Sequence, residues 1–195
     1  MSGGLDIIRS IRAGTRLVFG DPRALAEFDL GLSGFWRSFV VLAVLAPTVL
    51  VSALADDRLA AAAHEAMGVD TTSRLVVGTL TYLLGWIAFP LALAGLARPF
   101  GLGAVYVPWM IARNWTAVVS VLPSFVLTVL WLIGLLPNTS LGFASLFGLG
   151  FAMWCAFVVA RLAGGQPVAP AIAFVLLDFL LSMLVELGLD RLFGL

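Results

Sequence analysis

Long uncharged stretches, separated by short polar segments, dominate the pattern of this chain. The longest stretch runs for 47 residues, from Asn114 to Ala160, without one charged side chain. A single apolar helix of about 20 residues crosses the roughly 30 Å hydrocarbon core of a bilayer. The stretch therefore predicts two membrane-spanning helices, joined by the polar turn at residues 137–140.

The same criterion predicts five spans in the whole chain. They cover about residues 35–54, 75–97, 115–136, 141–160 and 168–189. Pro47, Pro90 and Pro123 fall inside three of them and predict kinks. Residues 99–112 are apolar but short and rich in proline and glycine. We expect them to form an interfacial or re-entrant segment on the cytoplasmic side.

Residues 1–34 differ from the remainder because their apolar and basic residues fall on separate faces of a helical wheel. Arg9, Arg12 and Arg16 are spaced three and four apart, opposite an apolar face that includes Ile8 and Ile11. This spacing predicts an interfacial helix whose guanidinium groups face lipid phosphates. A frayed cytoplasmic tail is the alternative. The chain thus divides into an N-terminal segment (1–34) and a five-span bundle (35–195).

Composition fixes the class of protein. The chain is 62% hydrophobic and 11% charged, with a mean hydropathy of +1.09, whereas soluble proteins carry about 25% charged residues. Solid apolar blocks exclude a transmembrane barrel, in which apolar and polar residues alternate. We predict an all-α polytopic membrane protein with the lipid bilayer as its first partner. The formal net charge of zero gives no reason to expect a nucleic-acid partner.

The arginines predict an orientation. All 11 basic residues are arginine, which we interpret as coding bias in a GC-rich genome, and we expect a bacterial inner membrane. With the N-terminus inside, eight arginines lie on the cytoplasmic side and three outside, as the positive-inside rule requires. The eight are Arg9, Arg12, Arg16, Arg23, Arg37, Arg98, Arg113 and Arg161, and the three are Arg58, Arg74 and Arg191. Five spans then place the C-terminus in the periplasm.

Small residues form stripes on two of the spans. In the second span they include Gly78, Gly85 and Gly95, and in the fourth they recur every four residues through Gly148, Ala152 and Ala156. Close backbone contact drives helix association in lipid, so these stripes predict helix-packing faces. A substrate lining is the alternative, and the stripes are also compatible with a homo-oligomer or a membrane partner subunit.

Asp178 is the candidate for chemistry, because it lies about ten residues into the fifth span. An ionised carboxylate near the bilayer centre costs roughly 2.5–3.5 kcal/mol, so burial favours the neutral acid. Ser182 and Glu186 follow at steps of four and extend a polar stripe along the same helix face. We expect this stripe to face the bundle, with Glu186 near the outer interface.

No arginine is expected at the depth of Asp178 on another span, so its predicted partners are hydroxyl groups. The candidates are Tyr82, Thr48, Ser124 and Thr128. Three interpretations follow: a protonated Asp178 that fixes helix packing, a proton- or ion-coupled site with Glu186 at its mouth, or a partner subunit that supplies the counter-charge.

An intramembrane enzyme is not expected. Aspartyl proteolysis needs facing carboxylates on two spans, and a single histidine, His64 in a loop, gives no Ser-His or Cys-His pair within the bilayer. The chain carries no HExxH or nucleotide-binding glycine motif. Cys155 is the only cysteine, which excludes an internal disulfide or a multi-cysteine metal site. We predict no catalytic residue, no cofactor and no metal.

Three short segments carry a family resemblance. They are Phe19-Gly20-Asp21-Pro22, the Phe35-Trp36 entry to the first span, and Arg161 followed by Gly164-Gly165 and the fifth span. With these segments and five spans, the chain resembles the Yip-type membrane protein family. The resemblance implies a cytoplasmic N-terminal region and a role in membrane organisation or, as in eukaryotic relatives, in trafficking-like interactions, and it supplies no catalytic residue.

Two functions emerge from the sequence. The first is a non-enzymatic inner-membrane protein that organises the membrane or serves as an accessory subunit through helix packing. The second is a small proton-coupled transporter or channel in which proton exchange at Asp178 couples to movement of the proline-kinked helices.

Overall fold

Every regular element in the described part of the chain is a helix. The computed structural model describes residues 3–62 and 71–193, and His64 lies outside these ranges. The elements are α1 (Gly3–Val18), η1 (Pro22–Glu27), α2 (Leu32–Ser38), α3 (Val40–Ala62), α4 (Thr71–Ala97), α5 (Gly103–Leu132), α6 (Thr139–Leu162) and α7 (Val168–Phe193). The all-α prediction is confirmed.

Five of the helices in the described ranges are long and apolar enough to cross a membrane. They comprise α2 with α3, then α4, α5, α6 and α7. The number of membrane-length helices therefore agrees with the prediction. Pro47, Pro90 and Pro123 all lie inside helices, as expected, and Pro108 lies inside α5 as well.

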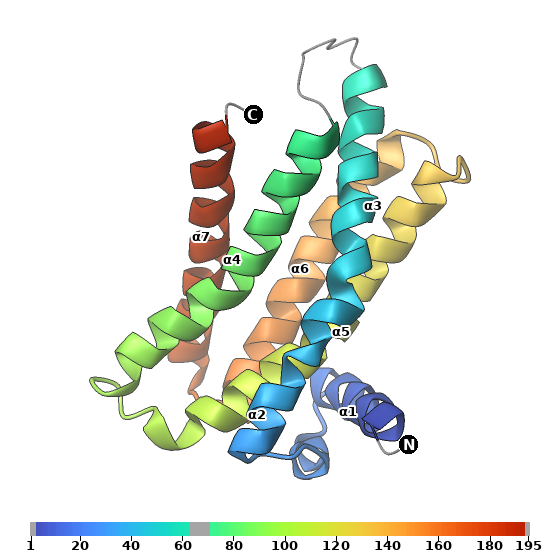
Figure 1. Cartoon of the computed structure of the whole chain (residues 1–195). Helices are drawn as coiled ribbons and strands as arrows, with labels where there is room; N and C mark the ends of the chain where they lie inside the picture. Colours follow the sequence, from blue (N-terminus) through green and yellow to red (C-terminus); the bar gives the residue numbers. More distant parts are fainter. Residues whose placement is uncertain (1–2, 63–70, 194–195) are drawn as a thin grey trace.

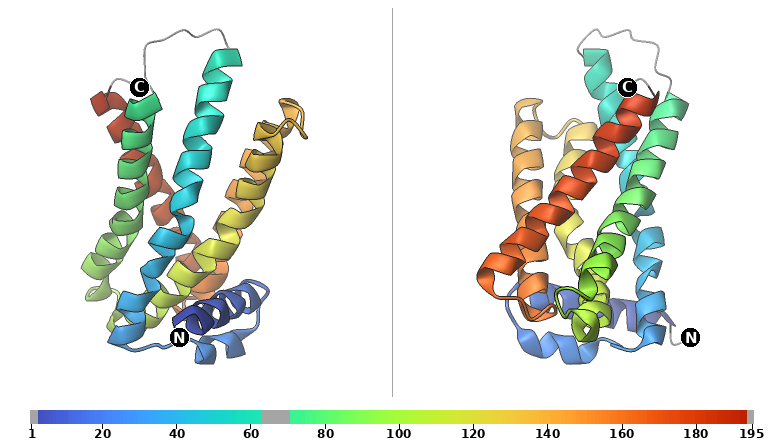
Figure 2. Two further views of the ribbon diagram at one scale, coloured as in Figure 1. Left: turned by 45° about the vertical axis from the view of Figure 1, so that its right-hand side comes forward. Right: turned by 90° about the vertical axis from the view of Figure 1, so that its left-hand side faces the viewer.

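The long helices form a bundle that α1 and η1 cross at one end, here called the α1 end (Figures 1 and 2). Helix α5 begins at this end and packs against α6, while α4 packs against α7. Helices α6 and α7 are joined at the α1 end and diverge toward the opposite end (Figure 2). The helix pairs α5–α6 and α4–α7 therefore enclose a wedge that widens away from α1.

The segment 99–112 differs from the prediction. Gly101, with a φ of 66°, lies in a tight turn after α4, where the Leu102 amide donates to the Ala97 carbonyl at 2.8 Å. Residues 103–112 are the first turns of α5 and are continuous with the predicted third span. The segment is thus a turn followed by helix, and it adds no sixth long helix to the described bundle.

Helix α1 packs one side against protein. Ala13, Leu17 and Val18 are fully buried. Gly14 permits a close approach, because a Cβ at this position would lie 3.1 Å from the Trp115 carbonyl oxygen of α5. The amphipathic pattern was therefore correctly assigned to a helix. Its buried side covers the end of α5 and α6, whereas Ile8 of the predicted apolar face is 66% exposed.

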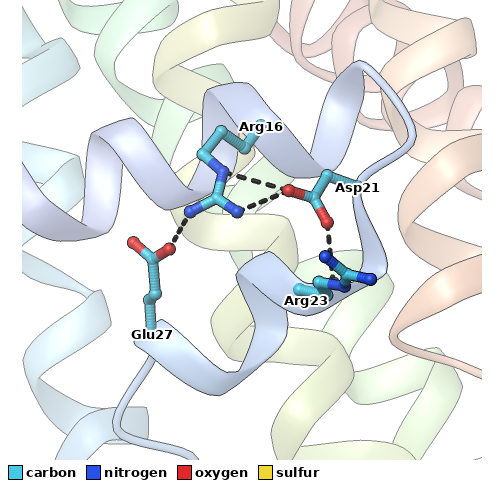
Figure 3. A network of polar contacts seen from close by, with 4 residues as sticks. All are labelled: Arg16, Asp21, Arg23 and Glu27. Atoms are coloured by element: carbon cyan, nitrogen blue, oxygen red, sulfur yellow. Dashed lines mark hydrogen bonds and ion pairs between the residues drawn. The ribbon is translucent and has the colours of Figure 1, made fainter.

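Arg16 also differs from the prediction, because its guanidinium pairs with carboxylates of the same chain and not with lipid phosphates. It donates to the carboxylates of Asp21 and Glu27, and the Arg23 amide donates to Asp21 at 3.0 Å (Figure 3). Hydrogen bonding by Arg16 holds the pKa of Asp21 below its ordinary value of 3.8. This network fastens η1 to α1, whereas Arg9 and Arg12 remain exposed.

The glycines of the two small-residue stripes differ in how closely neighbouring helices approach them. At Gly148 an added Cβ would lie 2.7 Å from the Ser124 Cβ, so α6 and α5 touch closely there. At Gly78 the nearest atom would be Val49 Cγ1 at 3.6 Å, whereas at Gly85 and Gly95 no atom would lie within 4 Å. Close helix contact therefore accounts for only part of each stripe.

Candidate functional site

A cavity of about 340 Å³ lies in the wedge between α4, α5, α6 and α7. Its walls combine aromatic rings, small residues and a few polar groups. The polar and charged lining residues are Thr81, Tyr82, Arg113, Thr116, Ser120, Asp178, Ser182 and Glu186. Concave, mostly apolar sites with a few placed polar groups are typical of small-molecule binding.

Arg113 of α5 and Asp178 of α7 form an ion pair inside this cavity. The Arg113 Nη2 donates to Asp178 Oδ1 at 3.0 Å and to Oδ2 at 3.3 Å. Their side chains are 19% and 21% exposed, respectively. The prediction that no arginine lies level with Asp178 is therefore wrong, because the Arg113 guanidinium, and not a hydroxyl group, contacts the Asp178 carboxyl group.

Helix geometry explains why these two residues meet. Arg113 and Asp178 are each ten residues beyond the first residue of their helix, and both helices begin at the α1 end (Figure 1). At 1.5 Å per residue, each side chain lies about 15 Å along its helix. The sequence pattern instead predicts Arg113 on the cytoplasmic side, because residues 99–112 are expected to lie outside the third span.

Three of the four hydroxyl groups predicted as partners of Asp178 donate hydrogen bonds elsewhere, and the fourth, that of Thr128, does not line the cavity. Tyr82 donates to the Leu42 carbonyl of α3 at 2.7 Å and so joins α4 to α3. Thr48 and Ser124 donate to carbonyls of their own helices, those of Leu45 and Val121. Tyr82 still lines the cavity, but its proton is used in helix packing.

The Arg113 guanidinium keeps unused hydrogen-bonding capacity. It lies over the Phe89 ring at 5.0 Å and near the Trp86 ring at 5.6 Å, within range of cation–π attraction. Its Nε is buried and has no acceptor among the described residues. A buried donor without an acceptor costs about 1–3 kcal/mol, or more when it carries charge.

Aromatic residues close the cavity toward the α1 end. Trp109 and Phe174 each precede a member of the ion pair by four residues, and their ring centroids are 5.1 Å apart. Phe89 packs edge-on against Trp109 at 6.3 Å. Gly164 completes the closure, since an added Cβ would lie 2.6 Å from the Trp109 ring. With Trp109 only 2% exposed, this layer separates the ion pair from the α1 end.

The polar stripe of α7 extends from the ion pair in the other direction. Asp178, Ser182 and Glu186 all line the cavity and span about 12 Å of helix. Gly85, Ala152 and Ala156 line it too, so these members of the small-residue stripes widen the cavity. The structure thus brings the predicted polar site together with half of the predicted packing residues. Arg113 was missed by the sequence analysis.

Comparisons with known proteins identified no related protein. No protein-family model matches this sequence, and neither a curated protein nor a solved structure shows significant similarity to it. The resemblance to the Yip-type family therefore stays a prediction. Function has to be argued from the cavity itself.

Proposed function

We propose that this chain is a non-enzymatic integral membrane protein that binds a small polar solute in the cavity and moves it across the membrane. One observation carries the proposal: a cavity of about 340 Å³ between the long helices has the Arg113–Asp178 ion pair in its wall. Ionisable residues in membrane-spanning segments are costly, and they mark substrate and ion pathways. An aromatic closure on one side and polar residues on the other fit an outward-facing site.

The ion pair also provides a means of proton coupling. Proton uptake by Asp178 would remove the charge that faces Arg113 and free the Arg113 Nη2 to bind a solute oxygen. Because charges interact more strongly in a medium of low dielectric constant, this single proton would alter solute affinity considerably. Opening toward the α1 end would then require the rings of Trp109, Phe89 and Phe174 to part.

The organising or accessory role gains less support. It depends on the small-residue ridge of α6 as a contact surface for another protein. Within this chain, Gly148 already packs against Ser124, while Ala152 and Ala156 line the cavity. Less of the ridge is therefore available to a partner. The bacterial inner membrane, with the N-terminus inside, remains the proposed location.

Proteoliposomes provide the test. The purified protein is reconstituted, a pH gradient is imposed with valinomycin setting the potential, and proton entry is followed with internal pyranine. Swelling by light scattering, with glycerol, glycine, ethylamine and acetate as probes, reports solute entry. We expect at least one solute, together with protons, to enter faster than into protein-free liposomes.

Asp178→Asn and Asp190→Asn form a matched pair of variants. Both remove one carboxylate from α7, but Asp190 lies beyond the cavity lining near the end of the helix. We expect Asp178→Asn to abolish coupled flux and Asp190→Asn to leave it unchanged. Equal flux in both variants, or no flux above that of empty liposomes for any probe, would overturn the proposal.

A further inference from the structure

A second cavity, of about 330 Å³, lies at the α1 end between α1, the start of α2–α3 and α5. It is separate from the central cavity and plays no part in the proposed transport. Its walls include two arginines, two aspartates and two tryptophans: Arg9, Arg37, Asp6, Asp29, Trp36 and Trp115. We call it the headgroup cavity, for the reasons that follow.

The charges of the headgroup cavity balance but are only partly paired. The Arg37 Nη2 donates to Asp6 Oδ2 at 2.6 Å. Asp29 accepts from the Ser33 hydroxyl at 2.7 Å and from the Gly31 amide at 3.1 Å, and these hydrogen bonds lower its pKa. Arg9 is exposed and has no ion-pair partner among the described residues. Arg37 also lowers the pKa of Asp29 through its charge, but Asp29 forms no ion pair within 4 Å in the described ranges. Arg9 and Asp29 are therefore the cation and the anion that a ligand can engage.

An apolar surface continues from the headgroup cavity along the bundle. Trp36 lines the cavity and is 71% exposed, and Val40, also in the lining, is 39% exposed. Val44, one turn further along α3, is exposed to the same extent. Tryptophan is enriched at the membrane interface, where its ring contacts both headgroups and hydrocarbon. This surface is suited to an acyl chain that leaves the cavity.

We propose that the headgroup cavity binds a zwitterionic phospholipid of the phosphatidylethanolamine type. Arg9 would hold the phosphate, Asp29 would accept from the ammonium group, and the acyl chain would follow Trp36, Val40 and Val44. A net-neutral headgroup preserves the charge balance, whereas an anionic headgroup would leave one excess negative charge. A water-soluble phosphate would leave the apolar surface uncovered.

Native mass spectrometry of the detergent-solubilised full chain tests the proposal by lipid titration. The probes are phosphatidylethanolamine, phosphatidylglycerol and glycerophosphoethanolamine, which is the headgroup without acyl chains. Arg9→Gln is compared with Arg12→Gln, a change on the same helix at an exposed arginine outside the cavity lining. Because a charge-assisted hydrogen bond is lost, we expect Arg9→Gln to weaken phosphatidylethanolamine binding about tenfold or more. Arg12→Gln should bind like the wild type.

Three results would overturn the proposal. They are equal binding by Arg9→Gln and the wild type, equal or tighter binding of phosphatidylglycerol, and binding of glycerophosphoethanolamine as tight as that of the diacyl lipid. A second measurement needs no change to Arg9. Brominated phosphatidylethanolamine should quench the wild-type fluorescence more than that of Trp36→Phe, and equal quenching would contradict the site.

Discussion

Replacing Asp178 with Asn should destabilise the protein, because it leaves the Arg113 guanidinium without a counter-charge. The change preserves side-chain size but weakens the contacts that Arg113 Nη2 makes at 3.0 and 3.3 Å. Exposed ion pairs contribute about 0–1 kcal/mol, whereas breaking a buried pair costs about 3–5 kcal/mol. Since the two side chains are 19% and 21% exposed, we expect a loss of about 2 kcal/mol.

A variant that removes both charges separates this cost from a general sensitivity of the site. Arg113→Gln should lose about 2 kcal/mol for the same reason, and up to about 1 kcal/mol more because its contact with the Phe89 ring disappears. Combining Arg113→Met with Asp178→Leu removes both charges together. Apolar replacement of a whole buried pair is often neutral or stabilising, so this variant should remain within about 1 kcal/mol of the wild type.

The native thiol provides the assay. Cys155 is 2% exposed and is the only cysteine, so its modification in SDS-containing mixed micelles reports unfolding. The free energy of unfolding is compared across the wild type, the two single variants and the double variant. The reasoning is refuted if Asp178→Asn stays within about 0.5 kcal/mol of the wild type. It is also refuted if the double variant loses the sum of the single effects.

Two further predictions concern helix packing and pH. Gly148→Ala should destabilise the protein by about 1–3 kcal/mol, because the added Cβ would lie 2.7 Å from the Ser124 Cβ. Gly150→Ala should be neutral or stabilising, because no atom lies within 4 Å of the added Cβ. Thermal unfolding in detergent compares the two variants, and similar melting temperatures would contradict the close contact at Gly148. Because folding lowers the pKa of Asp21 beside Arg16 below 3.8, its stabilising contribution is complete above that pH and is lost as the pH falls through the lowered pKa. The stability difference between wild type and Asp21→Asn should therefore hold from pH 5 to 7 and shrink as the pH falls below 3.8, and a difference that stays constant down to pH 2 would refute the pairing.

Much of the fold was predictable because long apolar segments of the sequence indicate where the membrane-length helices lie. The regions around the predicted spans 75–97, 141–160 and 168–189 became α4, α6 and α7 with only a few residues added at the ends. Lipid-facing and buried positions are both apolar, so hydrophobic patterning locates each helix without indicating which neighbour it faces. For the same reason, the sequence could not show that Ala152 lines a cavity while Gly148 packs against α5.

The ion pair was missed because the proline and glycine content of residues 99–112 led to a predicted start of α5 that was too late in the sequence. The proline and glycine content of residues 99–112 predicted a break, yet Gly101 alone provides the left-handed turn. Pro108 lies in the second turn of α5, where it costs the helix a single backbone hydrogen bond. A signal was nevertheless present: Arg113 is the only arginine between residues 99 and 160, and Asp178 lacked a counter-charge. Pairing the two would have extended α5 to its observed start.

Thiol labelling tests the central claim most directly, namely that a water-accessible cavity runs along α7 from the end opposite α1 toward Asp178. In a Cys155→Ser background, Ser182→Cys lies in the cavity lining, whereas Met183→Cys, its neighbour, lies outside it. A charged, membrane-impermeant methanethiosulfonate reacts with thiolates that water can reach. We expect it to modify Cys at position 182 in proteoliposomes, from the side opposite α1, and to spare position 183. Equal reactivity at both positions, or none at position 182, would contradict the account.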